Sequence, residues 1–332
     1  MSFKNKVVIV TGASSGIGAA AAKMFSDEGA RVVMVGRNEK KISAVAARCN
    51  SPLVILADVS KDDDARQIIN ETVKKFGQID VLVNNVGVTI NNGGLLADDM
   101  MSSYDAVMSI NLRSCVHLTS LAAPYLIKTK GNIVNISSNA GIIAPIGPGL
   151  AAYYVSKAGM NHFTVCAAAE LGVHGVRVNT VSPGPVRTDF FENAKSPIDF
   201  NDIRPMTLLN RVSEPEEMAD LILYLASDKA RGITGSNYLN DNGMNHFTVC
   251  AAAELGVHGV RVNTVSPGPV RTDFFENANS PIDFNDIRPM TLLNRVSEPE
   301  EMADLILYLA SDKARGITGS NYLNDNGMTI KH

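Results

Sequence analysis

The stretch Val7-Val8-Ile9-Val10-Thr11-Gly12-Ala13-Ser14-Ser15-Gly16-Ile17-Gly18 decides the fold of this chain. Its first four residues are an apolar run typical of a buried strand, and a helical pattern follows from about Ile17 to Asp27. The glycines between them let backbone N–H groups approach a pyrophosphate closely, and the helix N-terminus adds positive potential. The stretch therefore predicts a strand, a phosphate-binding turn and a helix in direct succession.

The same alternation continues along the chain. Helical patterns occupy 62–76, 104–128 and the residues from Tyr153 onward, and a later helix is predicted to start with Ser213 as its N-cap. Continuous apolar strands alternating with helices are typical of a parallel sheet covered on both faces, so we expect an α/β, doubly wound, Rossmann-type single domain. Ligands of such folds bind beyond the carboxyl ends of the strands. After the first strand, the predicted strands are 32–35, 52–56, 81–83, 132–136, 176–180 and 238–239.

The composition excludes several classes of function. The 332 residues carry a net charge of −4 in scattered form, so we expect no nucleic-acid partner and no membrane association. The four cysteines and six histidines lack the spacing of a disulfide framework or a metal site, so we expect no metal. The N-terminus runs straight into a strand, and no apolar run reaches the ~20 residues of a membrane helix. A cytoplasmic location is the resulting expectation.

Residues 159–242 recur almost unchanged as residues 243–326, at an offset of 84 residues. The two segments, named copy one and copy two below, differ only at Lys195 against Asn279. Solenoid repeats usually drift in sequence and recur several times, so this near-identity indicates either a recent tandem duplication or an assembly error. Removing the 84 residues of one copy from the 332 would leave 248, a normal size for one α/β domain.

Copy one is expected to complete the fold, because the helix that starts near Tyr153 runs into it without a break. We therefore expect residues 1–244 to form the functional domain. Residues 245–332 would be a near-identical duplicate of its C-terminal part, not an independent domain. Without the rest of a sheet copy two cannot bury its apolar faces, which leaves three states open. It would be disordered, exchanged into a neighbouring molecule, or packed as a poorly stabilised appendage.

Polar residues after the next strands predict a dinucleotide site. The second strand ends at Arg37-Asn38, where an NAD site carries a carboxylate for the ribose 2′-hydroxyl and a guanidinium suits a 2′-phosphate. This favours NADP(H), although Glu39 is close enough to leave NAD(H) possible. Asp58-Val59 follows the third strand, and Asn85 and Gly87 follow the fourth. Polar groups at these positions either contact adenine and ribose or cap a helix or turn.

Tyr153 and Lys157 are the candidate catalytic pair, because residues four apart share one helix face. A free phenol has a pKa near 10, too high for proton exchange at pH 7, and a nearby ammonium is expected to lower it. A fall of roughly 3 units needs about 4 kcal/mol, which a close cation and an oxidised nicotinamide can supply together. Ser138 ends the fifth strand and could hydrogen-bond the substrate oxygen. Asn111, inside the 104–128 helix, could hold a water behind Lys157.

Jointly these motifs resemble the short-chain dehydrogenase/reductase family, in its single-domain NAD(P)-dependent branch, and are similar to those of 3-oxoacyl-carrier-protein reductases. The resemblance covers residues 1 to about 244 and leaves copy two as surplus. The motifs are T-G-x-x-x-G-x-G at 11–18, D-V at 58–59, N-N-x-G at 84–87, Asn111, Ser138, Y-x-x-x-K at 153–157 and P-G at 183–184.

The resemblance implies a role for each of four residues. Tyr153 would be the acid/base, and Lys157 would lower its pKa and bind the nicotinamide ribose. Ser138 would orient the carbonyl, and Asn111 would support the water relay. No second Tyr–Lys pair exists in copy two, so we expect one active site per chain at most. The cofactor would contact Gly12, Ser14, Ser15, Gly16, Ile17, Gly18, Arg37, Asn38, Asp58, Val59, Asn85, Gly87, Tyr153, Lys157, Pro183, Gly184, Val186 and Thr188.

The expected reaction is therefore an NADP(H)-preferring hydride transfer between a ketone or aldehyde and an alcohol. The substrate would be set by residues 91–96, 138–150 and 190–205, the last apolar enough for a lipophilic ketone, steroid or fatty acyl group. A homodimer or homotetramer is implied unless copy two blocks the C-terminal surface. Two alternatives remain open: a dinucleotide-binding sensor or scaffold without turnover, and an inactive duplication product.

Overall fold

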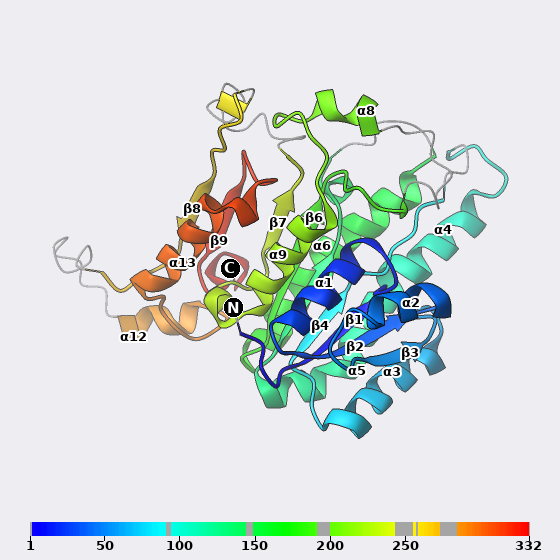
Figure 1. Ribbon diagram of the computed structural model, residues 1–332. Helices are drawn as coiled ribbons and strands as arrows, with labels where there is room; N and C mark the ends of the chain where they lie inside the picture. Colours follow the sequence, from blue (N-terminus) through cyan, green and yellow to red (C-terminus); the bar gives the residue numbers. More distant parts are fainter. Residues whose placement is uncertain are drawn as a thin grey trace.

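A computed structural model describes residues 2–90, 94–143, 149–190, 200–242, 255–256, 258–272 and 284–331 of the chain. Its centre is a seven-stranded parallel sheet in the order β3-β2-β1-β4-β5-β6-β7 (Figure 1), so the predicted doubly wound sheet is confirmed. The strands are β1 (Val7–Thr11), β2 (Arg31–Gly36), β3 (Leu53–Leu56), β4 (Val81–Asn84), β5 (Asn132–Ile136), β6 (Arg177–Pro183) and β7 (Asn237–Asn240).

Helices cover both faces of this sheet, because successive residues of each strand point to opposite sides. The helices are α1 (Gly16–Asp27), α2 (Glu39–Ala46), α3 (Asp62–Phe76), α4 (Met100–Met108), α5 (Ser114–Thr129), α6 (Ala151–Gly172), α8 (Phe200–Ile203) and α9 (Pro215–Ala226). Val8 and Val10 of β1 pack in one apolar cluster with α1, α2 and α9, and Val7 and Ile9 pack in a second cluster with α3, α5 and α6.

Two details of the predicted helices are wrong. The predicted helix 104–128 begins earlier, at Met100, and a π-helical turn at Ser109–Arg113 separates α4 from α5. The N-cap of α9 is Glu214 instead of Ser213, with Pro215 at the first helical position and a reciprocal capping box to Glu217. The Ser213 hydroxyl does not cap the helix and accepts instead from the Asn242 side-chain amide at 2.9 Å, while its backbone bridges to Val186.

Copy one supplies β6 and β7 of the sheet, and copy two lies beyond β7, at the edge opposite β3 (Figure 1). Of the states left open for copy two, its described part shows packing against copy one, as rings of β7 and β9 touch. Its strands β8 and β9 pair in parallel as a separate sheet. Its elements are β8 (Thr264–Pro267), α12 (Phe284–Ile287), α13 (Pro299–Ala310) and β9 (Asn321–Asn324), and the chain continues into α14 (Met328–Lys331).

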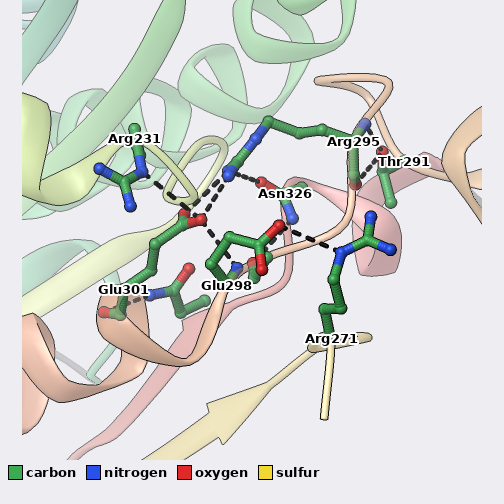
Figure 2. A network of polar contacts seen from close by, with 9 residues as sticks. Arg231, Arg271, Thr291, Arg295, Glu298, Glu301 and Asn326 are labelled. Atoms are coloured by element: carbon green, nitrogen blue, oxygen red, sulfur yellow. Dashed lines mark hydrogen bonds and ion pairs between the residues drawn. The ribbon is translucent and has the colours of Figure 1, made fainter. Parts of the chain in front are cut away.

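Side chains of the two copies also meet between their helices. The ring of Tyr308 in α13 stacks on that of Tyr224 in α9, with centres 4.5 Å apart. Arg231 of copy one approaches Glu301 of copy two at 3.5 Å. Figure 2 shows Arg231 and Arg295 converging on the Glu301 carboxylate from opposite sides.

Helices α9 and α13 have the same twelve residues and unequal surroundings. In α9, Ile222 and Leu223 are buried against the rest of the fold. Their counterparts Ile306 and Leu307 in α13 are 53% and 66% exposed. The difference arises because α9 packs against α1, whereas copy two has no equivalent of residues 1–158 to cover the same face.

Candidate active site

The carboxyl ends of the strands surround one cavity of about 1110 Å³. The ends of β1, β2, β4, β5 and β6 all contribute residues to it, as expected for a parallel sheet of this kind. Every predicted site residue lines this cavity except Gly18 and Asn111. The predicted residues that line it are Gly12, Ser14, Ser15, Gly16, Ile17, Arg37, Asn38, Asp58, Val59, Asn85, Gly87, Ser138, Tyr153, Lys157, Pro183, Gly184, Val186 and Thr188.

The glycine turn between β1 and α1 is packed too tightly for side chains. A Cβ on Gly18 would lie 2.3 Å from the carbonyl oxygen of Gly12, and one on Gly12 would lie 2.8 Å from the Asn85 amide nitrogen. Gly12 also has a φ of 67°, which side chains disfavour. Gly18 therefore allows α1 to pack closely against the turn. Gly12, Ser14, Ser15, Gly16 and Ile17 line the cavity there, where a pyrophosphate would fit.

Arg37 and Asp58 face each other at one end of the cavity, with 3.5 Å between guanidinium and carboxylate. Burial alone would raise the pKa of Asp58, but hydrogen bonds from Ser60 and the Arg37 charge hold it below its ordinary value. The Arg37 side chain is 66% exposed, so its guanidinium is open to a further anion. Asn38 also lines the cavity, and its side chain caps α2 by accepting from the Lys41 backbone N–H.

Tyr153 and Lys157 lie on the same face of α6, as their spacing predicts. The Lys157 ammonium is 5.7 Å from the centre of the Tyr153 ring and donates to the Ile136 carbonyl at 2.9 Å. Burial lowers the pKa of Lys157 to about 8. The Ser138 hydroxyl, just after the end of β5, accepts from the Ala140 N–H at 3.1 Å and lies near enough to the Tyr153 phenol to lower its pKa.

The pKa of Tyr153 is raised, whereas the sequence predicted that it would be lowered. Burial raises it to about 12, and the nearby Ser138 hydroxyl offsets only part of this rise. Spacing along a helix fixes which groups are neighbours, whereas desolvation depends on everything packed around them. A further positive charge beside the phenol is needed to bring this pKa toward neutrality.

Asn111 lies in the π-helical turn and is fully buried behind the cavity. Its amide oxygen accepts from the Val88 N–H at 2.8 Å, and its amide nitrogen donates to the Val88 carbonyl and the Ser156 hydroxyl. A Cβ on Gly87 would lie 3.8 Å from the Asn111 oxygen and 3.2 Å from the Lys157 nitrogen. Asn111 therefore anchors the backbone after β4 close to Lys157.

Sequence reasoning missed several residues of the cavity wall. Tyr154 follows Tyr153 on α6, with ring centres 6.3 Å apart, and Lys41 enters one turn into α2 and pairs with Asp189. Lys41 lies three residues after Asn38, so helical spacing could have placed it near the predicted site. Tyr154 directly follows Tyr153, so helical spacing does not put the two side chains on one face. Of the substrate segments predicted at 91–96, 138–150 and 190–205, residues 91–93, 144–148 and 191–199 lie outside the described residues.

The chain is similar in sequence to known proteins. The family model described as enoyl-(acyl carrier protein) reductase matches residues 12–245 and, a second time, residues 243–329. The 3-oxoacyl-[acyl-carrier-protein] reductase of Thermotoga maritima is 35% identical over 251 residues, 74% of this chain and 99% of that protein. The meso-2,3-butanediol dehydrogenase of Serratia marcescens is 36% identical over 248 residues, 73% of this chain and 96% of that protein.

A solved structure agrees with the sequence matches. A short-chain dehydrogenase/reductase of Caenorhabditis elegans, crystallised with cofactor, has a TM-score of 0.69 and 32% identity, covering 73% of this chain and 96% of that one. This chain belongs to the short-chain dehydrogenase/reductase family. As a short-chain dehydrogenase/reductase, it is an NAD(P)-dependent enzyme that acts on CH–OH groups.

Within the residues that the structure describes, no group of His, Cys, Asp and Glu side chains is arranged to hold a metal ion. Over the same residues, no helix has both the length and the apolar content needed to cross a bilayer.

Proposed function

We propose that this dehydrogenase/reductase interconverts an apolar ketone or aldehyde and its alcohol, prefers NADP(H), and uses Tyr153 as its acid/base. The observation that carries the proposal is that Arg37, after β2, lines the same cavity as Ser138, Tyr153 and Lys157, which lie at the end of β5. The glycine turn follows β1, which lies between β2 and β5 in the sheet. A dinucleotide is long enough to reach both groups, with its pyrophosphate at the glycine turn between them.

Different residues along the cavity would contact different parts of the dinucleotide. Backbone N–H groups at Gly12 and residues 14–17 would hold the pyrophosphate, and Asn38, Asp58, Val59, Asn85 and Gly87 would surround adenine and ribose. Pro183, Gly184, Val186 and Thr188 would line the nicotinamide side. The bound nicotinamide supplies or accepts the hydride.

Tyr153 would give a proton to the carbonyl oxygen from its hydroxyl, or take one from the alcohol in the reverse direction. Ser138 would hold the substrate oxygen next to that hydroxyl, since both residues line the same cavity and Ser138 is near enough to lower the Tyr153 pKa. Lys157 would stabilise the phenolate and bind the ribose, and Asn111 would support a water relay behind Lys157. A phenol with a pKa of about 12 makes this support necessary, because an acid/base works best with a pKa near the operating pH.

Arg37→Ala should separate the two cofactors. Loss of the guanidinium removes a charge-assisted contact to the 2′-phosphate, typically about 1.5–3 kcal/mol, so NADPH affinity should fall roughly 10- to 100-fold. NADH has no phosphate there, and its affinity should change little. Fluorescence titration of each reduced cofactor measures both constants. The exposed Arg48, outside the cavity, gives the control variant Arg48→Ala. Equal weakening of NADPH and NADH would contradict the NADP(H) assignment.

The wall beside Tyr153 is aromatic and apolar, which supports the substrate class. The Phe190 ring centre lies 5.8 Å from that of Tyr153, and Ile143, Leu150 and Met206 complete this part of the wall. Each additional methylene buried there can add up to ~0.8 kcal/mol, about fourfold in kcat/KM.

A homologous series of methyl ketones of increasing chain length tests this wall. We expect kcat/KM to rise over the first several methylenes in the unmodified enzyme, and to rise less steeply in Phe190→Ala. A flat series, or a preference for the shortest and most polar member, would contradict the apolar assignment.

Turnover itself tests the proposal against its alternative. A purified chain that binds NADPH and oxidises it with at least one apolar ketone supports an enzyme of this type. Cofactor binding without turnover on a broad panel of ketones, aldehydes and alcohols would instead favour a dinucleotide-binding sensor or scaffold.

A further inference from the structure

Lys157 is attached to the end of β5 at two points. Its ammonium donates to the Ile136 carbonyl at 2.9 Å, and its own backbone carbonyl accepts from the Ser137 hydroxyl at 3.1 Å. Both bonds are buried, since Lys157 is 3% exposed and Ser137 is 5% exposed. The lysine side chain thus spans from one residue of the strand end to its neighbour, so the position of the ammonium depends on where α6 lies against β5.

The Ser137 hydroxyl is itself held in place by the sheet. The Ser137 N–H donates to the Val181 carbonyl of β6 at 2.8 Å, next to the pair that Ile136 forms with Val181. The backbone that carries the hydroxyl therefore belongs to the rigid part of the fold. Ser137 acts as a fixed tie between the sheet and α6, at the residue of α6 that carries the ammonium.

A glycine allows the chain after Ser138 to approach the same peptide group. A Cβ on Gly141 would lie 2.9 Å from both the carbonyl carbon and the carbonyl oxygen of Lys157. It would also lie 2.6 Å from the Asn161 amide nitrogen, which donates to the Gly141 carbonyl at 3.3 Å. A side chain at Gly141 would therefore push this segment away from α6, because close-packed interiors have no room for an added carbon.

Ser138 lies between these two contacts along the chain. Ser137 precedes it, and the 3₁₀-helical turn Asn139–Gly141 follows it. On α6, Tyr153 lies one turn before Lys157, and the Lys157 ammonium is 5.7 Å from the centre of the Tyr153 ring. The contacts of Ser137 and Gly141 therefore hold the segment that carries Ser138 against the turn of helix that carries Tyr153 and Lys157.

Titratable groups from three helices face the pair. Cys115 of α5 faces Lys157, and burial raises the pKa of its thiol to about 12, so the thiol is neutral at pH 7. Tyr154 of α6 lies beside Tyr153, and Asp202 of α8 lines the same cavity. None of these three groups supplies a positive charge to the Tyr153 phenol. Ionisation of the phenol therefore depends on how close the Lys157 ammonium is held, since the attraction between charges falls with distance.

We propose that Ser137 is a positioning residue for proton transfer, because its hydroxyl fixes the Lys157 backbone at the end of β5 and so sets the distance from the ammonium to Tyr153. Gly141 permits the close packing that keeps this bond short. The inference rests on the proposed function, which assigns the proton transfer to Tyr153. Without the Ser137 hydroxyl, α6 can shift against β5 and carry the ammonium away from the phenol.

Ser137→Ala removes the hydroxyl and adds no volume. With NADP+ and a simple secondary alcohol as the probe, we expect kcat to fall roughly 10- to 100-fold, because displacing a reacting group by about 1 Å has an effect of this size. The pH at which kcat reaches half its maximum should rise by about 0.5–1, because the phenolate loses part of its stabilisation. Ser137→Thr keeps a hydroxyl and should keep this pH midpoint. An unchanged midpoint in Ser137→Ala would overturn the proposal.

Gly141→Ala tests the same geometry from the other side. It leaves the Ser137 hydroxyl in place but adds one carbon against the Lys157 carbonyl, so the pH midpoint should again rise. A midpoint equal to that of the unmodified enzyme would show that the close packing of Gly141 does not set the position of Lys157.

A matched control separates positioning from a general loss of packing. The Thr180 hydroxyl of β6 donates to the Thr164 hydroxyl of α6 at 2.7 Å, which is a second buried tie between the sheet and this helix. Thr180→Val removes that tie and should lower the free energy of unfolding about as much as Ser137→Ala, without moving the pH midpoint. Equal midpoint shifts in the two variants would mean that any loosening of α6 has this effect, and would overturn the role assigned to Ser137.

Tyr153→Phe distinguishes failure of this inference from failure of the proposed function. If Tyr153→Phe keeps its turnover, Tyr153 is not the acid/base, and the proposed function and the inference fall together. If Tyr153→Phe loses turnover while the pH midpoint of Ser137→Ala stays unchanged, the proposed function stands and the positioning role of Ser137 alone is wrong.

Discussion

Tyr153→Phe should lower kcat by about 10³-fold while leaving the affinity for NADPH within a few-fold of the unmodified enzyme. The substitution removes one oxygen and keeps the ring that packs against Phe190, so it deletes the proton donor without reshaping the cavity. Cofactor fluorescence titration measures the affinity, and single-turnover oxidation of NADPH measures the chemical step.

The adjacent tyrosine gives a matched control for that measurement. Tyr154 also lines the cavity, and Tyr154→Phe makes the same chemical change one residue away. We expect it to change kcat by less than about tenfold, because Tyr153 and not its neighbour shares a helix face with Lys157. Similar losses in both variants, or none in Tyr153→Phe, would refute Tyr153 as the acid/base.

Lys157→Met should stabilise the fold at neutral pH and abolish turnover. Lys157 is 3% exposed, and burial lowers its pKa from 10.5 to about 8, which corresponds to a cost of about 3 kcal/mol for holding the charge inside. Methionine removes that cost but also loses the hydrogen bond to Ile136, worth about 1 kcal/mol. The free energy of unfolding in urea should therefore rise by about 2 kcal/mol at pH 7.

The pH dependence of this gain has a fixed sign. Below pH 8 the folded and unfolded chains both keep the Lys157 proton, so the full cost is present. Between about 8 and 10.5 the folded chain loses the proton first, the unmodified protein recovers stability, and the advantage of Lys157→Met shrinks. The exposed Lys40→Met should shift stability by less than about 0.5 kcal/mol at any pH. If Lys157→Met were less stable than the unmodified protein at pH 7, and the deficit grew with pH, burial of the charged Lys157 would not be the cost inferred here.

The sheet was predictable because each strand carries its own signal. Runs such as Val7–Val10 are apolar without interruption, and glycine or polar residues end them, so local sequence was enough to locate all seven strands. The site residues were predictable for a related reason, since parallel strands bring their carboxyl ends to one edge. Gly12, Tyr153 and Lys157 therefore share one cavity although they are far apart in the chain.

Properties set by surroundings were not predictable in this way. Spacing placed a cation beside Tyr153 but could not measure the desolvation that raises its pKa to about 12. Asn111 was placed behind Lys157, but its side-chain bonds with Val88 and Ser156 could not be predicted from local sequence. Ser213 has a capping residue type, but its hydroxyl accepts a hydrogen bond from the side-chain amide of Asn242. In each case a contact distant in sequence decides the outcome.

The unequal burial of α9 and α13 has a consequence for how the two copies can change over generations. A polar replacement at Leu223 would disrupt the interior, whereas the same replacement at Leu307 would meet solvent and reduce an exposed apolar area that favours aggregation. Purifying selection therefore acts on one member of each such pair and is relaxed or reversed on the other. The first divergence between the copies should gather at Ile306 and Leu307, while Tyr308 and Glu301 are retained by the contacts they share with copy one.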